Sequence, residues 1–418
     1  MTKLTRGVLT GDLLNATFAG PIDAAPSPRR IGAEVEFIPV ESLTGRRCPI
    51  EGEGMTGTLP FLRCFGIRQG WREGRTPKGT PCFQLPSGGN ITFEPGGQLE
   101  YSSPPCRTAT QLLTRLRDVV LPLRAAAASE GIDLLALGID PLNSVERSPL
   151  LIRAKRYERM ATYFASLGPA GARMMRQTAS IQVNLDFDDE PWLRWRMLNA
   201  ASPYMTAIFA NSPLYGGEQT GFQSVRAAVW RQVDPSRTGI VYDEGRAVEA
   251  YLEFALSAPS ILLPTLQGEY RSFGEWITLS SPTLDEWHEH LSTLFPEVRP
   301  RGHLELRSID AIPPEWYAAP ITLLAGMLYD PGALRDADDL LGEPDPSLLD
   351  RAARGGVHDP SIASIAADLF QIGLSGCRRL GAEYVHPADL EEAQDFFERY
   401  TKRARTPADD VVENAIAA

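Results

Sequence analysis

The chain has 418 residues and a formal net charge of −12. Its length suffices for a large core, or for two or three domains, and no apolar run approaches the length of a membrane span. The acidic balance disfavours nonspecific nucleic-acid binding through a basic surface. The N-terminus lacks the apolar segment of a signal peptide, and the five cysteines form no CxxC pair. We therefore expect a cytoplasmic protein with free thiols that acts without nucleic acid or membrane partners.

The first half of the chain combines turn-rich stretches with regular elements. Glycine and proline are frequent before residue 105, whereas a stretch between Thr108 and Glu130 carries apolar residues at helical spacing. In chain order, the expected elements are a helical lead-in with a Pro-rich connector (1–30), a strand (31–40), hairpins and loops (44–105), a helix (108–130), a short buried strand (133–138) and a helical stretch with a break at 168–169 (153–175).

The second half is richer in helical patterns and ends in a short tail. Its expected elements, in chain order, are a strand (179–187), a helix (192–211), an irregular Gly-rich segment (212–240), two helices (245–257 and 283–295), a strand (303–309), a mostly helical region (315–402) and a loosely held tail (403–418). Strands do not alternate regularly with helices. The pattern therefore predicts an α+β protein with a mainly antiparallel sheet and helices against one face.

Three strand-like stretches place charged side chains two residues apart. Glu34 and Glu36 share one, Glu100 ends a Gly-rich second one, and Glu305 stands two residues before Arg307. Residues at this spacing point to the same face of a strand. Carboxylates gathered on one face repel each other unless they are solvated or hold a cation, and Mg²⁺ prefers oxygen ligands. The pattern favours a magnesium-nucleotide site, with an ordinary wet strand face as the alternative.

Six short blocks add a family resemblance to this pattern. In one order along the chain, they resemble the plant and bacterial type of glutamate–cysteine ligase. The blocks are GAEVE (32–36), EPGGQLE (94–100), IQVNLD (181–186), ANSP (210–213), LFPEVR (294–299) and LELR (304–307). The stretch SIDAIPPE (308–315) differs from the Gly-rich plant form. It is more similar to the actinobacterial enzymes that supply γ-glutamylcysteine for ergothioneine synthesis.

The resemblance implies a glutamine-synthetase-like fold, in which a curved antiparallel sheet forms a funnel with helices packed outside. The likeness runs from about residue 31 to residue 330. For the whole chain, we expect a single catalytic domain over 31–402, between an N-terminal lead-in (1–30) and a C-terminal tail (403–418), and a monomer or weak homodimer. The resemblance also implies ATP and Mg²⁺ as cofactors. ATP phosphorylates the γ-carboxylate of L-glutamate, and the amine of L-cysteine then displaces phosphate to give γ-glutamylcysteine. Such a transfer depends on positioning and charge neutralisation more than on a protein nucleophile.

Carried to this sequence, the resemblance assigns roles to individual residues. It implies that Arg307 meets the reacting carboxylate or its phosphate. The metal ligands that it implies are Glu34, Glu36, Glu94, Glu100 and Glu305, of which Glu94 precedes a proline that could turn it away. The substrate contacts that it implies are Gln182, Asn184, Arg226, Trp230 and Arg237. For Arg226 and Arg237, the alternative is that each forms an ion pair at the protein surface.

Three other functions remain as alternatives. A ligase of the same fold could use another amine, and a phosphotransferase acting on a guanidino group would keep the same acids and Arg307. A non-catalytic relative that binds an amino acid or nucleotide would be expected to lose some of the acids, and this chain keeps all of them. A zinc hydrolase is disfavoured, because the five histidines show no HExxH spacing.

Overall fold

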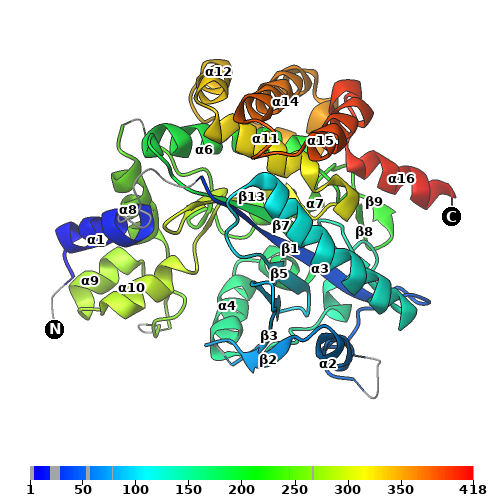
Figure 1. Ribbon diagram of the computed structural model, residues 1–418. Helices are drawn as coiled ribbons and strands as arrows, with labels where there is room; N and C mark the ends of the chain where they lie inside the picture. Colours follow the sequence, from blue (N-terminus) through cyan, green and yellow to red (C-terminus); the bar gives the residue numbers. More distant parts are fainter. Residues whose placement is uncertain are drawn as a thin grey trace.

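A nine-stranded antiparallel sheet forms the centre of the computed structural model, which describes residues 4–18, 29–52, 57–77, 79–243, 245–265 and 268–417 (Figure 1). Along the sheet the order is β12 (Val298–Pro300), β13 (Leu304–Asp310), β7 (Ser180–Leu185), β1 (Ile31–Glu41), β5 (Leu99–Ser102), β4 (Asn90–Phe93), β3 (Pro81–Gln84) and β2 (Arg72–Arg75). Strand β6 (Ile132–Leu135) pairs with β1 beside this path.

Strand β1 is the centre of the sheet because it pairs with three neighbours. Its first half lies between β5 and β7, and its second half pairs with β6. Val35 and Phe37 are buried in the main apolar core, whereas the alternate residues Glu34 and Glu36 point to the opposite face. The strand predicted for 31–40 is therefore confirmed, and so is its separation into an apolar and an acidic face.

Helices cover the apolar face of the sheet (Figure 1). Helix α3 (Ala109–Ser129) packs against β1 and β6, α6 (Pro191–Ile208) against β13, and α11 (Ala318–Tyr329) against β7. Three more helices pack outside α11, namely α12 (Pro331–Leu341), α14 (Pro360–Leu380) and α15 (Pro387–Arg399). The backbones of α11 and α14 nearly touch: a Cβ added to Gly326 would lie 1.9 Å from the carbonyl oxygen of Gly373, so no larger residue fits at this crossing.

A second group of helices surrounds the polar face. Its members are α4 (Lys155–Ala165), α5 (Ala170–Gln177), α7 (Val225–Arg231), α8 (Ala247–Ser257) and α10 (Leu284–Leu291). In Figure 1, α8 and α10 gather with α1 (Arg6–Asp12) and α9 (Phe273–Leu279) at the left of the sheet. Each helix of the group contributes side chains to one cavity over the sheet. These helices therefore enclose the polar face of the sheet. Together they form the funnel-like cleft that was expected from a curved sheet.

Several predicted elements are confirmed. Helix α3 begins after Thr108, whose side chain accepts a hydrogen bond from the N–H of Gln111, and it ends before Glu130. The break expected at 168–169 separates α4 from α5, and the predicted helix at 192–211 is α6. The N-terminal helical pattern is α1 followed by a π-helical turn (Leu13–Phe18), while the Pro-rich part of the connector lies outside the described residues.

Three expectations are wrong. The segment 212–240 was expected to be irregular, yet it contains helix α7 (Val225–Arg231). The region 44–105 was expected to hold hairpins and loops, yet it also contains helix α2 (Thr58–Arg68), which buries Phe61, Leu62 and Phe65. The tail expected to be loose is instead helix α16 (Pro407–Ala417). It is anchored because Ala408 is fully buried and donates its N–H to the carbonyl of Ala210.

Among the described residues, no helix combines the length and the apolar character that crossing a bilayer would require.

Candidate active site

A cavity of about 690 Å³ lies over the polar face of the central strands. Its floor is acidic, with carboxyl groups from β1 and from the β4–β5 hairpin. Its walls carry arginines from several elements, and an apolar side comes from α4, α5, α7 and α10. The arginines that line it are Arg156, Arg226, Arg299, Arg301 and Arg307. A site that joins clustered acids to clustered arginines suits a metal-bound polyphosphate, because each group then meets its opposite charge.

The acidic floor is set by strand register. Glu36 and Glu100 lie directly opposite each other on β1 and β5, and Glu34 lies opposite Gln182 of β7. Residues opposite each other on adjacent strands share a face, so these side chains converge. Glu94 also lines the cavity, and the proline after it does not turn it away.

The glycine turn between β4 and β5 makes this arrangement possible. Gly97 has a positive φ of 83°, which favours glycine. A Cβ added to Gly96 would lie 2.3 Å from the carbonyl oxygen of Arg176 at the end of α5. The turn therefore packs directly on α5, and this contact holds Glu94 and Glu100 on either side of it.

Burial and crowding perturb the four floor acids. Burial, with added repulsion from Glu100, raises the pKa of Glu34 to about 8. Burial and repulsion from Glu36 raise the pKa of Glu100 to about 7, although hydroxyl groups of Ser102 and Thr92 oppose this shift. The pKa of Glu36 is also raised, and that of Glu94 lies well above its ordinary value, in both cases mainly through burial.

This donor set fits Mg²⁺, which prefers carboxylate oxygens. Within the described part of the chain, no three His, Cys, Asp or Glu side chains are arranged to hold one ion between them. Mg²⁺ usually takes only one or two carboxylates and completes its shell with water and phosphate oxygens. Pairs such as Glu36 with Glu100, opposite each other on neighbouring strands, match that requirement.

The shifted pKa values predict how stability depends on pH. In Mg²⁺-free buffer, we expect the free energy of unfolding to fall from about pH 5 to about pH 8. The folded-state pKa values of Glu34 and Glu100, about 8 and about 7, exceed the ordinary value of 4.5. Their contribution is therefore fully present below the unfolded pKa and is lost as the pH rises through the folded values. Urea unfolding at several pH values, in the presence of a chelator, measures this fall in the free energy of unfolding.

The matched control for this pH series is Glu100→Gln, which removes one titrating group and should flatten part of the fall. Stability that is constant or rises over this interval in the unmutated protein would contradict the predicted direction.

Arg307 lies at the centre of the cationic wall. Its Nη1 donates to Oε1 of Gln182 over 2.6 Å and lies 3.5 Å from Oε2 of Glu305. The guanidinium sits over the rings of Trp230 and Phe295, at 5.5 and 5.9 Å from their centroids. Two aromatic faces and one amide therefore fix the guanidinium, which leaves its orientation preorganised for an anion in the cavity.

Glu305 differs from the floor acids because it is already paired. Both of its carboxylate oxygens accept hydrogen bonds from Arg299, with Nη2 to Oε1 at 2.9 Å, and Glu305 is fully buried behind the cavity surface. Burial alone would raise the pKa of Glu305, but the guanidinium groups of Arg299 and Arg307 outweigh it and hold the pKa well below its ordinary value. Glu305 is therefore ionised, and a metal would have to share it with Arg299.

The structure brings most of the predicted site residues to this cavity, but not all. Gln182, Arg226 and Trp230 line it. Asn184 lies on the same face, opposite Glu305, but it is not part of the cavity lining.

Arg237 lies outside the cavity and is fully buried. Its guanidinium donates to Asp234 at 2.8 Å and to the carbonyls of Thr293 and Pro259 at 3.0 and 2.7 Å. With these partners, Arg237 stabilises the interior of the protein. The prediction that it contacts the substrate is therefore corrected. The sequence offered one signal of this role, because Asp234 lies three residues before Arg237 and is its ion-pair partner.

Sequence reasoning missed several residues of the cavity. Arg299 lies directly opposite Glu305 in the β12–β13 hairpin, with Gly302 in the turn between the strands. This hairpin was the only signal that could have linked them. Arg156 enters from α4 and donates to Ser292 at 2.6 Å, and Phe295 comes from the segment after α10. Arg156 carries no local pattern that marks it as part of a site, whereas Phe295 lies in the block LFPEVR (294–299), which was the available signal.

Comparisons with known proteins show the family of the chain. The family described as Glutamate-cysteine ligase family 2 (GCS2) matches residues 30–413, and the chain belongs to this family. The glutamate–cysteine ligase EgtA of Mycolicibacterium smegmatis is 36% identical over 349 residues, which are 80% of this chain and 79% of that protein. The chloroplastic glutamate–cysteine ligase of Solanum lycopersicum is 30% identical over 359 residues, covering 78% and 65%.

A solved structure supports the fold. The crystal structure of glutamate–cysteine ligase from Francisella tularensis in complex with AMP has a TM-score of 0.54 with this chain. It covers 92% of this chain and 84% of the other, at 13% sequence identity. The likeness shows a shared fold, and the family predicted from the six sequence blocks is confirmed by the family match.

Proposed function

We propose that the protein is an ATP-dependent glutamate–cysteine ligase that forms γ-glutamylcysteine, ADP and phosphate. Its membership of the glutamate–cysteine ligase family supports this proposal. The observation that carries it in the structure is a single cavity with four half-buried acids on its floor and five arginines around it. Such a cavity can hold a nucleotide triphosphate and an amino-acid carboxylate at the same time.

The reaction has two steps. An oxygen of the glutamate γ-carboxylate attacks the γ-phosphorus of ATP, the bond to the β-phosphate oxygen breaks, and ADP leaves. The neutral amine of cysteine then attacks the acyl carbon, the bond to the phosphate oxygen breaks, and the amine loses a proton. The amide of γ-glutamylcysteine and inorganic phosphate are the products. Both steps develop negative charge on oxygen atoms, which fixed donors stabilise.

The described side chains divide this work between them. The fork of Arg307 can hold the γ-carboxylate with two parallel hydrogen bonds, and then the acyl phosphate. Arg226 and Arg299, on either side of it, supply positive charge for the transferred phosphate. Trp230 and Phe295 cover Arg307 and exclude water, which strengthens these contacts.

We propose that Mg²⁺ ions bind in this site, each through one or two of the acids Glu34, Glu36, Glu94 and Glu100, with Glu305 shared between a metal and Arg299. When bound, Mg²⁺ neutralises phosphate oxygens and orients the γ-phosphate for transfer. The raised pKa values of Glu34 and Glu100 support the assignment, because a cation would offset both the burial and the mutual repulsion that raise them.

The remaining proposals concern the setting of the enzyme. Residues 31–402 form one catalytic domain, the protein acts in the cytoplasm, and it is a monomer or weak homodimer. Its similarity to EgtA enzymes supports ergothioneine synthesis as the pathway that uses the product, with glutathione synthesis as the alternative that the plant relatives suggest.

Direct detection of the product tests the function. We expect purified protein with ATP, Mg²⁺, L-glutamate and L-cysteine to yield γ-glutamylcysteine by mass spectrometry, with ADP and phosphate in equal amounts. Omitting any one component should abolish the product.

A panel of other amines in place of cysteine completes the experiment. Phosphate release with another amine, and none with cysteine, would show a ligase of the same fold with a different acceptor. A folded protein that releases no phosphate with any amino-acid pair would overturn the ligase assignment itself.

A further inference from the structure

The strand that carries Arg307 contains an irregularity. Along β13, Leu306 pairs with Val183 of β7, and the next pair is Ile309 with Ile181. Three steps on one strand match two on the other, so β13 holds one extra residue, which is a β-bulge. Without it, residues 307 and 310 would face opposite sides of the sheet. With it, both Arg307 and Asp310 reach the cavity side, because Asp310 lies opposite Ser180, which lines the cavity.

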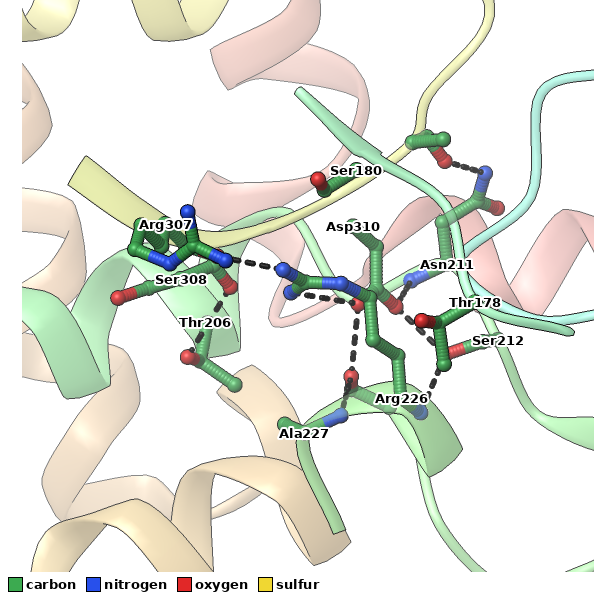
Figure 2. Close-up of polar contacts among 12 residues, drawn as sticks. Thr178, Ser180, Thr206, Asn211, Ser212, Arg226, Ala227, Arg307, Ser308 and Asp310 are labelled. Carbon is green, nitrogen blue, oxygen red and sulfur yellow. Dashed lines mark hydrogen bonds and ion pairs between the residues drawn. The ribbon is translucent and has the colours of Figure 1, made fainter. Parts of the chain in front are cut away.

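The two residues at the bulge, Arg307 and Ser308, have no paired residue on β7, and their carbonyl groups accept hydrogen bonds from side chains. The carbonyl of Arg307 accepts from Nη2 of Arg226 over 2.6 Å, and that of Ser308 accepts from the hydroxyl of Thr206 over 3.2 Å (Figure 2). Both donors are buried, at 4% and 2% exposure. Side chains from α7 and α6 thus hold the bulge in place, as is common for bulges that direct a side chain.

Asp310 lies beside this contact and holds the start of α7. Its Oδ1 accepts from the hydroxyl of Ser224 at 2.9 Å, and its Oδ2 accepts from Ser212 at 2.6 Å and from the N–H of Asn211 at 2.9 Å (Figure 2). Ser224 is the N-cap of α7, and its oxygen also accepts from the N–H of Ala227. The carboxylate is 1% exposed, so these bonds are formed away from water.

Asp310 also neutralises Arg226, whose Nη1 lies 3.7 Å from Oδ1. Arg226 and Trp230 are four residues apart on α7, share one face of that helix and both line the cavity. A shift at the start of α7 would therefore move both side chains that contact Arg307. The place left for the Asp310 carboxylate is tight: a Cβ added to Gly138 would lie 2.4 Å from its Cγ.

We propose that Asp310 is a positioning residue, which fixes α7 and, through Arg226, the backbone of the β-bulge at Arg307, and so keeps Arg307 in place in the cavity. The proposal rests on the ligase function proposed above. Asp310 itself lies outside the cavity lining. It differs from an ordinary buried ion pair, because its partner Arg226 contacts Arg307, and so does Trp230 on the helix that Asp310 holds.

A double-mutant cycle tests this coupling. Asp310→Asn keeps the shape of the side chain but removes its charge, and we expect kcat/KM for glutamate to fall about tenfold to a hundredfold, as for other residues that orient an active group. The KM for ATP should change little. In Arg226→Met, the further change Asp310→Asn should have a clearly smaller effect than it has alone, because part of the action of Asp310 passes through Arg226. Additive losses, or wild-type kinetics in Asp310→Asn, would overturn the proposal.

Asp389→Asn is the matched control. Asp389 is 3% exposed, accepts from a threonine hydroxyl and pairs with Arg117 at 2.7 Å, but it lies outside the cavity. We expect it to lower the melting temperature and to leave kcat/KM unchanged. If Asp310→Asn does not fold, Ser212→Ala removes one donor to Asp310 and should show a smaller loss of the same kind.

A structural readout separates this proposal from the ligase assignment. Crystal structures of the unmutated protein and of Asp310→Asn, or Ser212→Ala, need no activity. We expect the variant to lose the contact between Arg307 and Gln182 or the register shift of β13. An unchanged Arg307 in the variant would overturn the positioning role even in an active ligase. An unmutated protein that forms no γ-glutamylcysteine would instead overturn the ligase function alone.

Discussion

Replacing Arg307 by lysine should lower kcat/KM for glutamate by about a hundredfold or more, while the KM for ATP changes little. Lysine keeps the positive charge but loses the planar fork that can hold a carboxylate with two bonds. It also loses the flat surface that lies over Trp230 and Phe295. The γ-carboxylate would then be bound without a fixed orientation, and its attack on ATP would slow. Steady-state kinetics with each substrate varied in turn measures the effect.

Arg307 has a second partner that suggests another outcome. If it only balances the charge of Glu305, which lies 3.5 Å away, then Arg307→Lys should leave the kinetics nearly unchanged and lower the melting temperature instead. Measuring both quantities on one preparation decides between the two roles. Gln182→Ala is a useful companion variant, because it removes the amide that fixes Nη1 and should cause a smaller loss of the same kind.

Removing one floor acid should affect turnover and stability in opposite directions. For Glu100→Gln, we expect turnover at limiting Mg²⁺ to fall about a hundredfold, because a metal ligand is lost. High Mg²⁺ should restore part of it. In Mg²⁺-free buffer near neutral pH, the same variant should melt at a higher temperature than the unmutated protein. The reason is that Glu100 faces Glu36 across the strand pair, and an amide removes that repulsion.

Glu73→Gln is the control for this pair of measurements. Glu73 lies on β2 of the same sheet, is exposed, and pairs with Arg63 at 2.9 Å outside the cavity. It should change neither the Mg²⁺ dependence nor, beyond a small effect, the melting temperature. If Glu100→Gln keeps the turnover and the metal dependence of the unmutated protein, the magnesium site on the sheet floor is wrong.

Local sequence patterns predicted those parts of the fold that depend on nearby residues. The alternation in β1 placed Glu34 and Glu36 on one face, and Thr108 marked the start of α3. Both signals act over a few residues, and the structure confirms both. Helix α2 was missed for the same reason: its glycine, proline and cysteine resemble a loop, although its apolar face is buried in the core.

The cationic wall could be predicted only in part, because it depends on pairing across long distances. Arg299 meets Glu305 through the register of a hairpin, and the extra residue at the bulge of β13 changes which side chains reach the cavity. Neither register is visible in one strand alone. For Arg237 the error is the opposite one, because a residue was assigned to the site that does not belong to it. An arginine among polar residues resembles a ligand contact, but the three hydrogen-bonding partners of Arg237 belong to the protein itself.

The strand order has a consequence for how the protein is made. Glu34 pairs with Gln182, and β7 gains its other neighbour only when β13, beginning at Leu304, has been synthesised. A nascent chain therefore holds its acids on β1 and β5 long before Arg299 and Arg307 exist to balance them. Burying those carboxylates early is unfavourable, which keeps the cleft from closing on the unfinished chain. Closure of the sheet and neutralisation of its charge then coincide in one late folding step, and pairing over such distances makes that step slow.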